Sequence, residues 1–337
     1  MPAFFSLTST DLKAELTRLN LPAYQADHAF RIIYQNPAEG WQGVSPIKKE
    51  LRENLGVEIP VALPVTVADQ RSKDGTRKVL SKLADGQTIE TVWIPSRERM
   101  TVCISSQVGC KLDCKFCQTG QGGFFRNLTP DEIVGQLVVG GRRPDNIVFM
   151  GMGEPLDNLE SLAQSIRVLH EPNGMNMGWR RLTVSTVGLI PAMQKLSAEF
   201  PEINWAISLH SLDQDVRQKI MPIGKKYDVD AVVDAAGEIF RRTGRRVSFE
   251  WVCLEGVNDR DADLHDLMTL LTGEAGFHLN LLPYHPTTAG PFTGTSRKRI
   301  HHIADELEGQ GCHVTVRESR GLDIDGACGQ LRVRQSA

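Results

Sequence analysis

The sequence predicts an α/β protein whose main part is an open, partial (β/α)6 barrel, preceded by a small helical domain and a short β extension. Three observations support this prediction. From residue 100 onward, runs rich in Val, Ile and Leu alternate six times with segments of helical periodicity. Such alternation is typical of a parallel sheet or barrel, and six units fall short of the eight in a closed barrel. The chain of 337 residues, 41% of them hydrophobic, is long enough for one barrel-sized domain and a smaller one.

The first part of the chain has a helical pattern. Ser9-Thr10-Asp11 can cap a helix that extends through Leu19, and the runs 24–34 and 46–55 continue the helical pattern. Residues 1–57 are therefore expected to form an accessory helical domain, which holds no catalytic constellation.

Residues 58–98 change to short β-rich pieces. Strands are expected at 66–68, 78–83 and 88–95, with turns at Lys73-Asp74-Gly75 and Asp85-Gly86. We predict a small antiparallel sheet that serves as a connector and carries Glu90.

The barrel is expected over residues 99–317, and the tail 318–337 is expected to be a loop. The predicted barrel strands are 101–106, 146–151, 181–186, 204–209, 246–254 and 278–283, with a late strand at 313–317. The predicted helices are 130–139, 159–169, 191–200, 229–241, 260–271 and 297–309. In such a barrel the functional residues lie on the loops that follow the strands. Unusual polar or glycine-rich runs fall at these places, namely the loop after the first strand and residues 150–155, 185–188, 208–211 and 284–286.

The loop after the first strand contains Cys110, Cys114 and Cys117 with the spacing C-x3-C-x2-C. Three thiolates cannot all pair as disulfides, but they can hold a soft metal centre. A four-iron cluster normally takes four thiolates, so three ligands leave one iron open for a substrate or cofactor. A structural zinc site needs four ligands, and no Cys or His follows Cys117 before His170. The spacing favours a cluster that performs chemistry, and a zinc knuckle or an inert cluster remains the alternative.

Composition excludes several classes of protein. The formal net charge of −3 is not that of a strongly basic nucleic-acid binder, and no apolar run approaches the ~20 residues of a membrane helix. The first ten residues have no signal-peptide pattern. Seven cysteines, three of them in an oxidation-sensitive motif, indicate a reducing cytoplasm. Several clusters of basic residues could still bind the phosphates of a nucleic acid locally. These clusters are Arg142-Arg143, Arg180-Arg181, Lys225-Lys226, Arg241-Arg242, Arg245-Arg246 and Arg297-Lys298-Arg299.

The cysteine spacing, with Phe116 directly before the third cysteine, resembles the signature of radical S-adenosylmethionine (SAM) enzymes. Over nearly its whole length, the chain further resembles the RlmN/Cfr family of radical SAM RNA methyltransferases. The matching motifs are Glu90 in the run 86–92, Cys103 seven residues before Cys110, the run 151–156, and Cys328 in the run 323–330. The resemblance implies a partial, TIM-like radical SAM barrel.

The resemblance also implies the cofactors and their ligands. Cys110, Cys114 and Cys117 would hold a [4Fe–4S] cluster, and two molecules of SAM would be used per turnover. Glu154 would bind the SAM ammonium group by a charge-assisted bond, beside a glycine that allows a close backbone approach. The implied SAM-binding residues are Phe116, Gly153, Glu154, Ser185, Ser208, Leu209, His210 and His285. The family usually has Asn-Pro where this chain has His285-Pro286.

The implied reaction methylates a ring carbon of adenosine in 23S rRNA, with tRNA as a further substrate. Cys328 would carry the methyl group, Cys103 would release the product through a transient disulfide with Cys328, and Glu90 would act as general base. The remaining cysteines, Cys253 and Cys312, are interpreted as small hydrophobic residues. C2 is the expected carbon. C8 methylation and a non-catalytic iron–sulfur RNA-binding protein remain the alternatives. The expectation includes a monomer, an external electron donor, no membrane partner, and RNA contact by residues 1–57.

Overall fold

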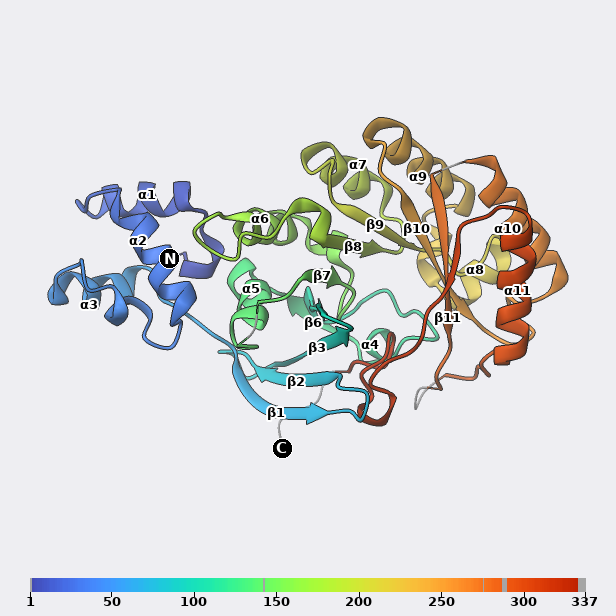
Figure 1. The fold of residues 1–337 in the computed structure, drawn as a ribbon, viewed down its shortest axis with the longest axis horizontal. Coiled ribbons are helices and arrows are strands. Elements are labelled where there is room, and N and C mark those ends of the chain that lie inside the picture. Colours follow the sequence, from blue (N-terminus) through green and yellow to red (C-terminus); the bar gives the residue numbers. More distant parts are fainter. Residues whose placement is uncertain (1, 142, 275, 287–289, 333–337) are drawn as a thin grey trace.

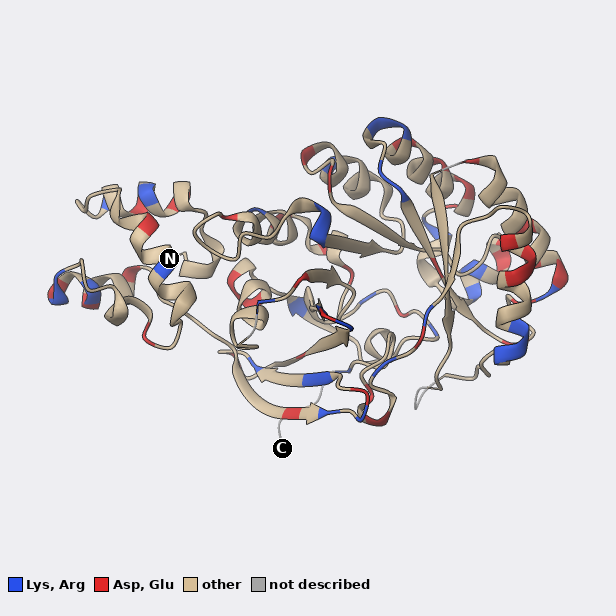
Figure 2. Cartoon of the chain, in the orientation of Figure 1, with Lys and Arg blue, Asp and Glu red and all other residues tan. Residues whose placement is uncertain are grey.

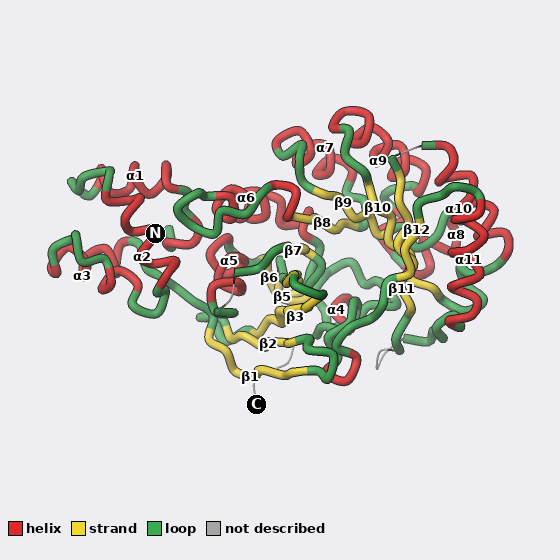
Figure 3. Tube along the Cα trace, in the orientation of Figure 1, coloured by secondary structure: helices red, strands yellow, loops and turns green. Residues whose placement is uncertain are grey.

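One curved sheet of ten strands forms the centre of the protein, in the order β1-β2-β3-β4-β7-β8-β9-β10-β11-β12. The structure is a computed structural model that describes residues 2–141, 143–274, 276–286 and 290–332. Neighbouring strands from β4 to β12 are parallel, which confirms the predicted open barrel. The helices that alternate with the parallel strands lie on the outer side of this sheet, and the N-terminal helices form a group beside it (Figures 1 and 3).

The barrel strands are short and largely buried. The hydrophobic core packed against them includes large side chains such as Phe149, Trp205 and Phe249, whose burial is the main stabilising contribution to the barrel. The strands of this part are β4 (Arg99–Cys103), β7 (Asn146–Phe149), β8 (Leu182–Thr186), β9 (Asn204–Ser208), β10 (Val247–Cys253), β11 (Phe277–Pro283) and β12 (Val314–Val316).

The predicted barrel helices are all present, with ends that differ by one or two residues. Helix α5 begins with a Thr129–Glu132 capping box and a proline in its first turn, and both features are strong start signals. The helices are α5 (Pro130–Val138), α6 (Leu159–His170), α7 (Ile190–Glu199), α9 (Val229–Thr243), α10 (Asp261–Gly273) and α11 (Arg297–Gly309).

Three helices form the N-terminal part, and a cluster of aromatic rings is its core. They are α1 (Ser9–Arg18), α2 (Gln25–Gln35) and α3 (Lys49–Glu58). Thr8, one residue earlier than expected, caps α1 by a reciprocal bond with Asp11. The Phe4 ring lies 5.1 Å from Phe30 and 5.6 Å from Trp41, between ring centroids. Gln164 Nε2 on α6 donates to the Ser6 carbonyl at 2.9 Å, so these helices are fixed to the barrel.

The predicted β extension is present, and it is continuous with the barrel sheet. Strands β1 (Val65–Arg71), β2 (Arg77–Lys82) and β3 (Thr88–Ser96) pair antiparallel, as expected. However, β3 also pairs antiparallel with β4, from Val92↔Cys103 to Ser96↔Arg99. The extension therefore continues the barrel sheet, because the buried face of β3 packs into the same core as β4.

A β-hairpin and two short α-helices were not predicted. The hairpin of β5 (Gln107–Gly109) and β6 (Phe124–Asn127) forms a two-stranded sheet, and the short helices α4 (Gln118–Gln121) and α8 (Gln214–Ile220) flank the cysteine loop. Each is too short to produce a periodic signal. Within the described residues, no helix has the length and apolar character needed to cross a bilayer.

The basic clusters are distributed over the molecule and interleaved with acidic residues (Figure 2). Several have carboxylate partners: Arg241 pairs with Glu274 at 2.7 Å, and Arg299 pairs with Asp261 at 2.7 Å. Arg142 lies outside the described residues. Arg241 and Arg299 are therefore engaged in ion pairs within the protein.

Candidate active site

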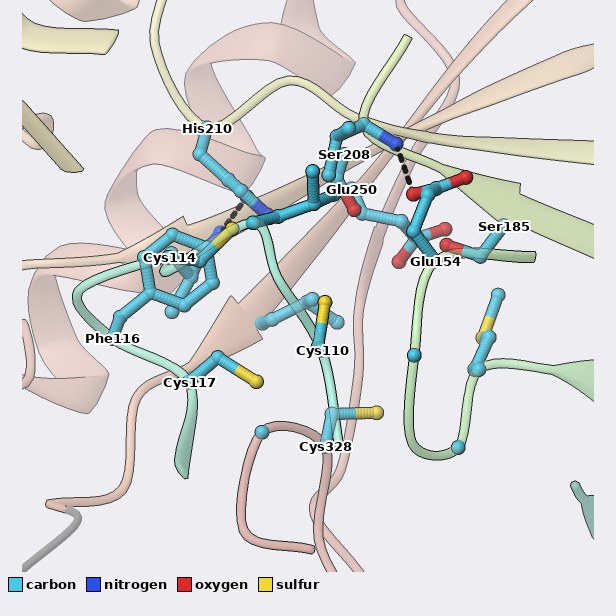
Figure 4. Close-up of a pocket in the computed structure, with 18 of the residues that line it drawn as sticks. Cys110, Cys114, Phe116, Cys117, Glu154, Ser185, Ser208, His210, Glu250 and Cys328 are labelled. Carbon is cyan, nitrogen blue, oxygen red and sulfur yellow. Dashed lines mark hydrogen bonds between the residues drawn. The ribbon is translucent and has the colours of Figure 1, made fainter. Parts of the chain in front are cut away.

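Two adjoining cavities lie at the ends of the parallel strands, and the cysteine loop and the C-terminal tail form their walls. The first encloses about 1000 Å³, solvent at its mouth included, and is lined by Cys110, Cys114, Cys117, Glu154 and their neighbours (Figure 4). The second is lined by Cys103, Thr315, Arg317 and Arg320. Cys328 lines both cavities, as do Cys117 and His285.

The three cysteines of the motif lie together on one wall of the first cavity. The loop is fixed at both ends, because Cys110 N–H donates to the Gly123 carbonyl at 2.8 Å and Lys115 N–H donates to the Ile220 carbonyl at 2.8 Å. Burial raises the pKa of the Cys110 thiol to about 12, and neighbouring Cys117 adds to this rise. Burial likewise raises the pKa of Cys114, with further contributions from Cys117 and Cys110. The thiols are thus close enough to affect one another and would be thiolates only with a cationic centre among them.

The donor set fits an iron–sulfur cluster better than a single ion. Within the described part of the chain, no three His, Cys, Asp or Glu side chains converge on one point as a single metal ion requires. Thiolates that each bind a different iron need not converge in this way, and three soft sulfur ligands beside an open cavity match a cluster with one free iron. Cys110, Cys114 and Cys117 would hold it.

Glu154 is a buried carboxylate that faces the first cavity. Its Oε1 accepts from Leu156 N–H at 3.1 Å and its Oε2 accepts from Val187 N–H at 3.0 Å. Burial raises the pKa of Glu154 to about 7, although the Val187 N–H bond opposes this. No cationic side chain of the described residues forms an ion pair with it. An ammonium group of a ligand would supply the missing positive charge, so the carboxylate suits SAM.

Gly153 holds the backbone beside Glu154 in a form that other residues adopt rarely. Its φ is +100°, and an added Cβ would lie 2.5 Å from Gln107 Cβ and 2.9 Å from Gln107 N. The Gln107 side chain in turn accepts from Glu154 N–H at 2.9 Å. Gly153 therefore permits a turn that places the carboxylate in the cavity.

Gly153→Ala is expected to weaken SAM binding and to lower the free energy of unfolding by about 2–4 kcal/mol, because a left-handed backbone and a clash add up. Calorimetric titration with SAM and thermal denaturation measure the two effects. Gly256→Ala is the matched control: Gly256 also has a positive φ, of +68°, but nothing lies within 4 Å of its added Cβ. Equal SAM affinity for the wild type and Gly153→Ala would contradict this role for the turn.

The predicted SAM-binding residues are mostly brought together. Phe116, Ser185, Ser208, His210 and His285 line the first cavity with Gly153 and Glu154. Leu209 does not line it, since its side chain is fully buried in the core and its N–H donates to the Glu250 carbonyl at 3.1 Å.

His210 is held as a neutral imidazole against Phe116. Its Nδ1 accepts from Val252 N–H at 3.0 Å, and its ring meets the Phe116 ring edge-on at 4.7 Å between centroids. Burial lowers the pKa of His210 to about 3, with a smaller contribution from Arg217. Because Nδ1 is an acceptor, the ring proton is on Nε2, where it is a donor.

The sequence analysis missed Glu250. It lies on β10, lines the first cavity, and accepts from Asn280 Nδ2 at 2.7 Å. Ser208, Glu250 and Asn280 are register partners across β9, β10 and β11 and so form one polar row inside the barrel. An acidic residue between Phe249 and Trp251 in an apolar strand was the available signal.

Cys103 and Cys328 both line the second cavity. Both thiols are free, Cys103 buried at the end of β4 and Cys328 exposed on the C-terminal tail. Burial raises the pKa of the Cys103 thiol, and the charge of Cys328 adds to it, so the two sulfurs interact. Figure 4 shows Cys328 on a separate loop, next to the three cysteines of the motif. The fold thus brings Cys103 and Cys328 to the same cavity, although more than two hundred residues separate them in the chain.

Glu90 does not line either cavity. Its side chain is only 1% exposed, and its Oε1 lies 3.3 Å from Lys78 Nζ. Its Oε2 accepts from Arg332 N–H at 2.9 Å. Glu90 therefore lies beneath the tail that carries Cys328. Its carboxylate contacts the backbone of this tail and does not face either cavity.

His285 also contacts the tail. Its Nε2 and Ser319 Oγ are 2.6 Å apart, and burial lowers the pKa of His285 below its usual value, so it is neutral at pH 7. The imidazole thus links the loop after β11 to the segment after β12, in a place where the family usually has an asparagine.

Comparison with known proteins agrees with this geometry. Residues 104–268 match the model of the radical SAM superfamily. The chain is 38% identical to the dual-specificity RNA methyltransferase RlmN of Nitratiruptor sp. over 98% of both chains. It is 39% identical to the protein of the same name from Sulfurovum sp., over 99% of both chains.

A solved structure gives the same result for the fold. The crystal structure of a radical SAM methyltransferase from Sphaerobacter thermophilus superposes with a TM-score of 0.93 at 41% identity, covering 98% of this chain and 99% of that one. The match includes the N-terminal helices, the β extension and the C-terminal tail, because it spans nearly both chains. The predicted fold class is confirmed, and so are the cofactors, a [4Fe–4S] cluster and SAM. The chain belongs to the RlmN family of radical SAM RNA methyltransferases.

Proposed function

We propose that this enzyme, an RNA methyltransferase by family, methylates C2 of an adenosine in 23S rRNA, and of an adenosine in tRNA, by way of a methyl group on Cys328. One observation carries the proposal. Cys328 lines both cavities, so one sulfur faces the cysteine loop on one side and the space shared with Cys103 on the other. A residue that receives a methyl group in one cavity and transfers it to RNA in the other needs this placement.

When bound, the cluster and SAM supply a methyl group and a radical strong enough to activate it. Cys328 Sγ accepts the methyl group and loses its thiol proton. That methyl group would lose one hydrogen atom to the SAM-derived radical, and its carbon, still bonded to Cys328 Sγ, would form a bond to the adenine carbon. Loss of one electron from this adduct to the cluster would give a closed-shell thioether between protein and RNA. C2 of adenine is not nucleophilic, so a carrier of this kind answers a chemical need that direct methyl transfer does not.

Cys103 releases the product. Its thiolate attacks Cys328 Sγ, a disulfide forms, and the carbon–sulfur bond breaks with its electron pair left on the carbon, which takes up a proton and becomes the methyl group of the product. Glu90 takes the proton from the adenine carbon as general base. Glu90 Oε2 accepts from Arg332 N–H, four residues after Cys328, and this proximity to the tail supports the role.

The second cavity has the character of a base-binding pocket. It is lined by the apolar side chains Val92, Ile94 and Leu282 and by two cations, Arg317 and Arg320. An unstacked base fits between apolar walls, and phosphates fit the cations at the rim. We expect the enzyme to act as a monomer in the cytoplasm, where cysteines remain reduced and an external electron donor serves the cluster.

The test is nucleoside analysis of RNA treated with the reconstituted enzyme. We expect 2-methyladenosine in a 23S rRNA fragment and none with Cys328→Ala. 8-Methyladenosine would assign the alternative carbon, and a methylated ribose or an unmodified RNA would contradict the proposal.

RNA binding should depend on salt. Two phosphate contacts, by Arg317 and Arg320, predict roughly a sevenfold loss of affinity from about 50 to 200 mM salt. Arg320→Ala should lower the slope of log affinity against log salt by about 0.7. Lys298→Ala, at an exposed position on α11, is the control and should leave the slope unchanged. Fluorescence anisotropy with an rRNA fragment measures these values, and salt-insensitive binding would contradict a phosphate interface here.

A further inference from the structure

A buried lysine on β2 contacts the tail that carries Cys328. Lys78 is 2% exposed, and its Nζ donates to the Asp325 carbonyl at 3.1 Å and lies 3.3 Å from Glu90 Oε1. Leu80 is the register partner of Glu90, so Lys78, two residues before Leu80, lies diagonally across from Glu90 on the same face. Tail and strand are 247 residues apart in the chain, so this contact is purely tertiary.

The Lys78–Glu90 pair holds the tail on both sides of Cys328. Asp325, whose carbonyl accepts from Lys78, precedes Cys328 by three residues, and Arg332, whose N–H donates to Glu90, follows it by four. Helix α4 binds the middle of the tail, because Gln118 N–H donates to the Gly329 carbonyl at 2.7 Å. The α4 contact ties the tail to the cysteine loop, whereas the Lys78–Glu90 pair ties it to the β extension.

The burial of these charges needs an explanation. A buried ion pair often contributes no more stability than well-packed apolar residues of the same size, because both ions lose their hydration. Its charge-assisted bonds are strongly directional, however, and they fix the groups they bind. A backbone carbonyl and a backbone N–H of the tail are the groups fixed here.

We propose that Lys78 is a positioning residue for methyl transfer: it holds the Asp325 carbonyl and the Glu90 carboxylate together and so keeps Cys328 at the junction of the two cavities. The inference rests on the proposed function in one respect, namely that Cys328 is the methyl carrier. The placement of the tail by Lys78 does not depend on that role.

The experiment uses the full-length enzyme with its cluster. Lys78→Met removes the ammonium group from beside a buried carboxylate, and it can fail to fold for that reason. The informative variant is Lys78→Met combined with Glu90→Gln, in which both charges of the pair are removed and the amide oxygen introduced by Glu90→Gln still accepts from Arg332 N–H. Glu90→Gln alone keeps Lys78 and is the matched control. Lys82→Met, at an exposed position on the same strand, is the second control.

The first readout needs no methyl transfer. Hydrogen exchange over residues 321–332 and the rate of Cys328 alkylation by iodoacetamide are measured without SAM. We expect both to rise about tenfold or more in the double variant relative to Glu90→Gln, because a bond from a charged donor is lost. The melting temperature should stay within a few degrees of that of Glu90→Gln. Unchanged exchange and alkylation in the folded double variant would overturn the proposal.

The second readout is the amount of methylated Cys328 after incubation with SAM, measured by mass spectrometry. We expect a loss of about tenfold or more in the double variant relative to Glu90→Gln, while Lys82→Met is methylated like the wild type. A double variant methylated at the wild-type rate would overturn the positioning role. Absence of methylated Cys328 in the wild type would contradict the proposed function, while the exchange result would still decide whether Lys78 places the tail.

Discussion

Cys103→Ala is expected to accumulate as a covalent protein–RNA complex. The variant retains Cys328 and the cavity, so methylation of Cys328 and attachment to adenine proceed, but the thiol that opens the thioether is missing. Turnover should stop after about one equivalent of RNA is bound. A denaturing gel measures this as a nuclease-sensitive shift of the protein band.

Two variants control that experiment. Cys328→Ala has no sulfur at the junction of the cavities and should give neither product nor complex. Cys312→Ala removes another buried free thiol, at the end of the α11 unit away from both cavities, and should turn over like the wild type. Normal turnover of Cys103→Ala without a trapped complex would contradict the role of Cys103 and direct attention to Cys253.

Replacing any one of Cys110, Cys114 or Cys117 by alanine should abolish both SAM cleavage and RNA methylation. Anaerobic reconstitution of the wild type should give about four irons per chain, and each variant should lose most of this iron because a thiolate ligand is missing. Iron analysis and the visible absorption of the cluster measure the loss. Cys312→Ala serves again as the control. Stoichiometric zinc without iron uptake by the wild type would contradict a cluster at this loop.

The sequence predicted the barrel well because its signal is local. Strand and helix periods, caps such as that of α5 and the six-fold alternation depend on neighbours in the chain. The continuity of the β extension with the barrel sheet was not predicted, because the pairing of β3 with β4 depends on a shared core and not on local pattern. The hairpin β5–β6 and helix α4 were missed because three or four residues carry no period.

The candidate site was predictable only where several functional residues lie close together in the sequence. The cysteine loop and the run 151–156 have a spacing that few other functions share, and the structure brings them to one cavity. Single residues had no such signal. Glu250 was missed, although a carboxylate in an apolar strand pointed to it, and Lys78 resembled an ordinary solvated strand lysine until the tail was placed over it. Both contacts join distant parts of the chain, which a linear pattern does not record.

The most direct test of the central claim, that Cys328 carries the methyl group to RNA, is isotopic. The enzyme is incubated with methyl-deuterated SAM, separated from it, and then given unlabelled SAM, a reductant and an rRNA fragment. We predict a deuterated methyl group on the sulfur of Cys328 after the first step and a deuterated methyl group on a ring carbon of adenosine after a single turnover, both detected by mass spectrometry. An unlabelled Cys328, or RNA methylated only from the second, unlabelled SAM, would contradict the account.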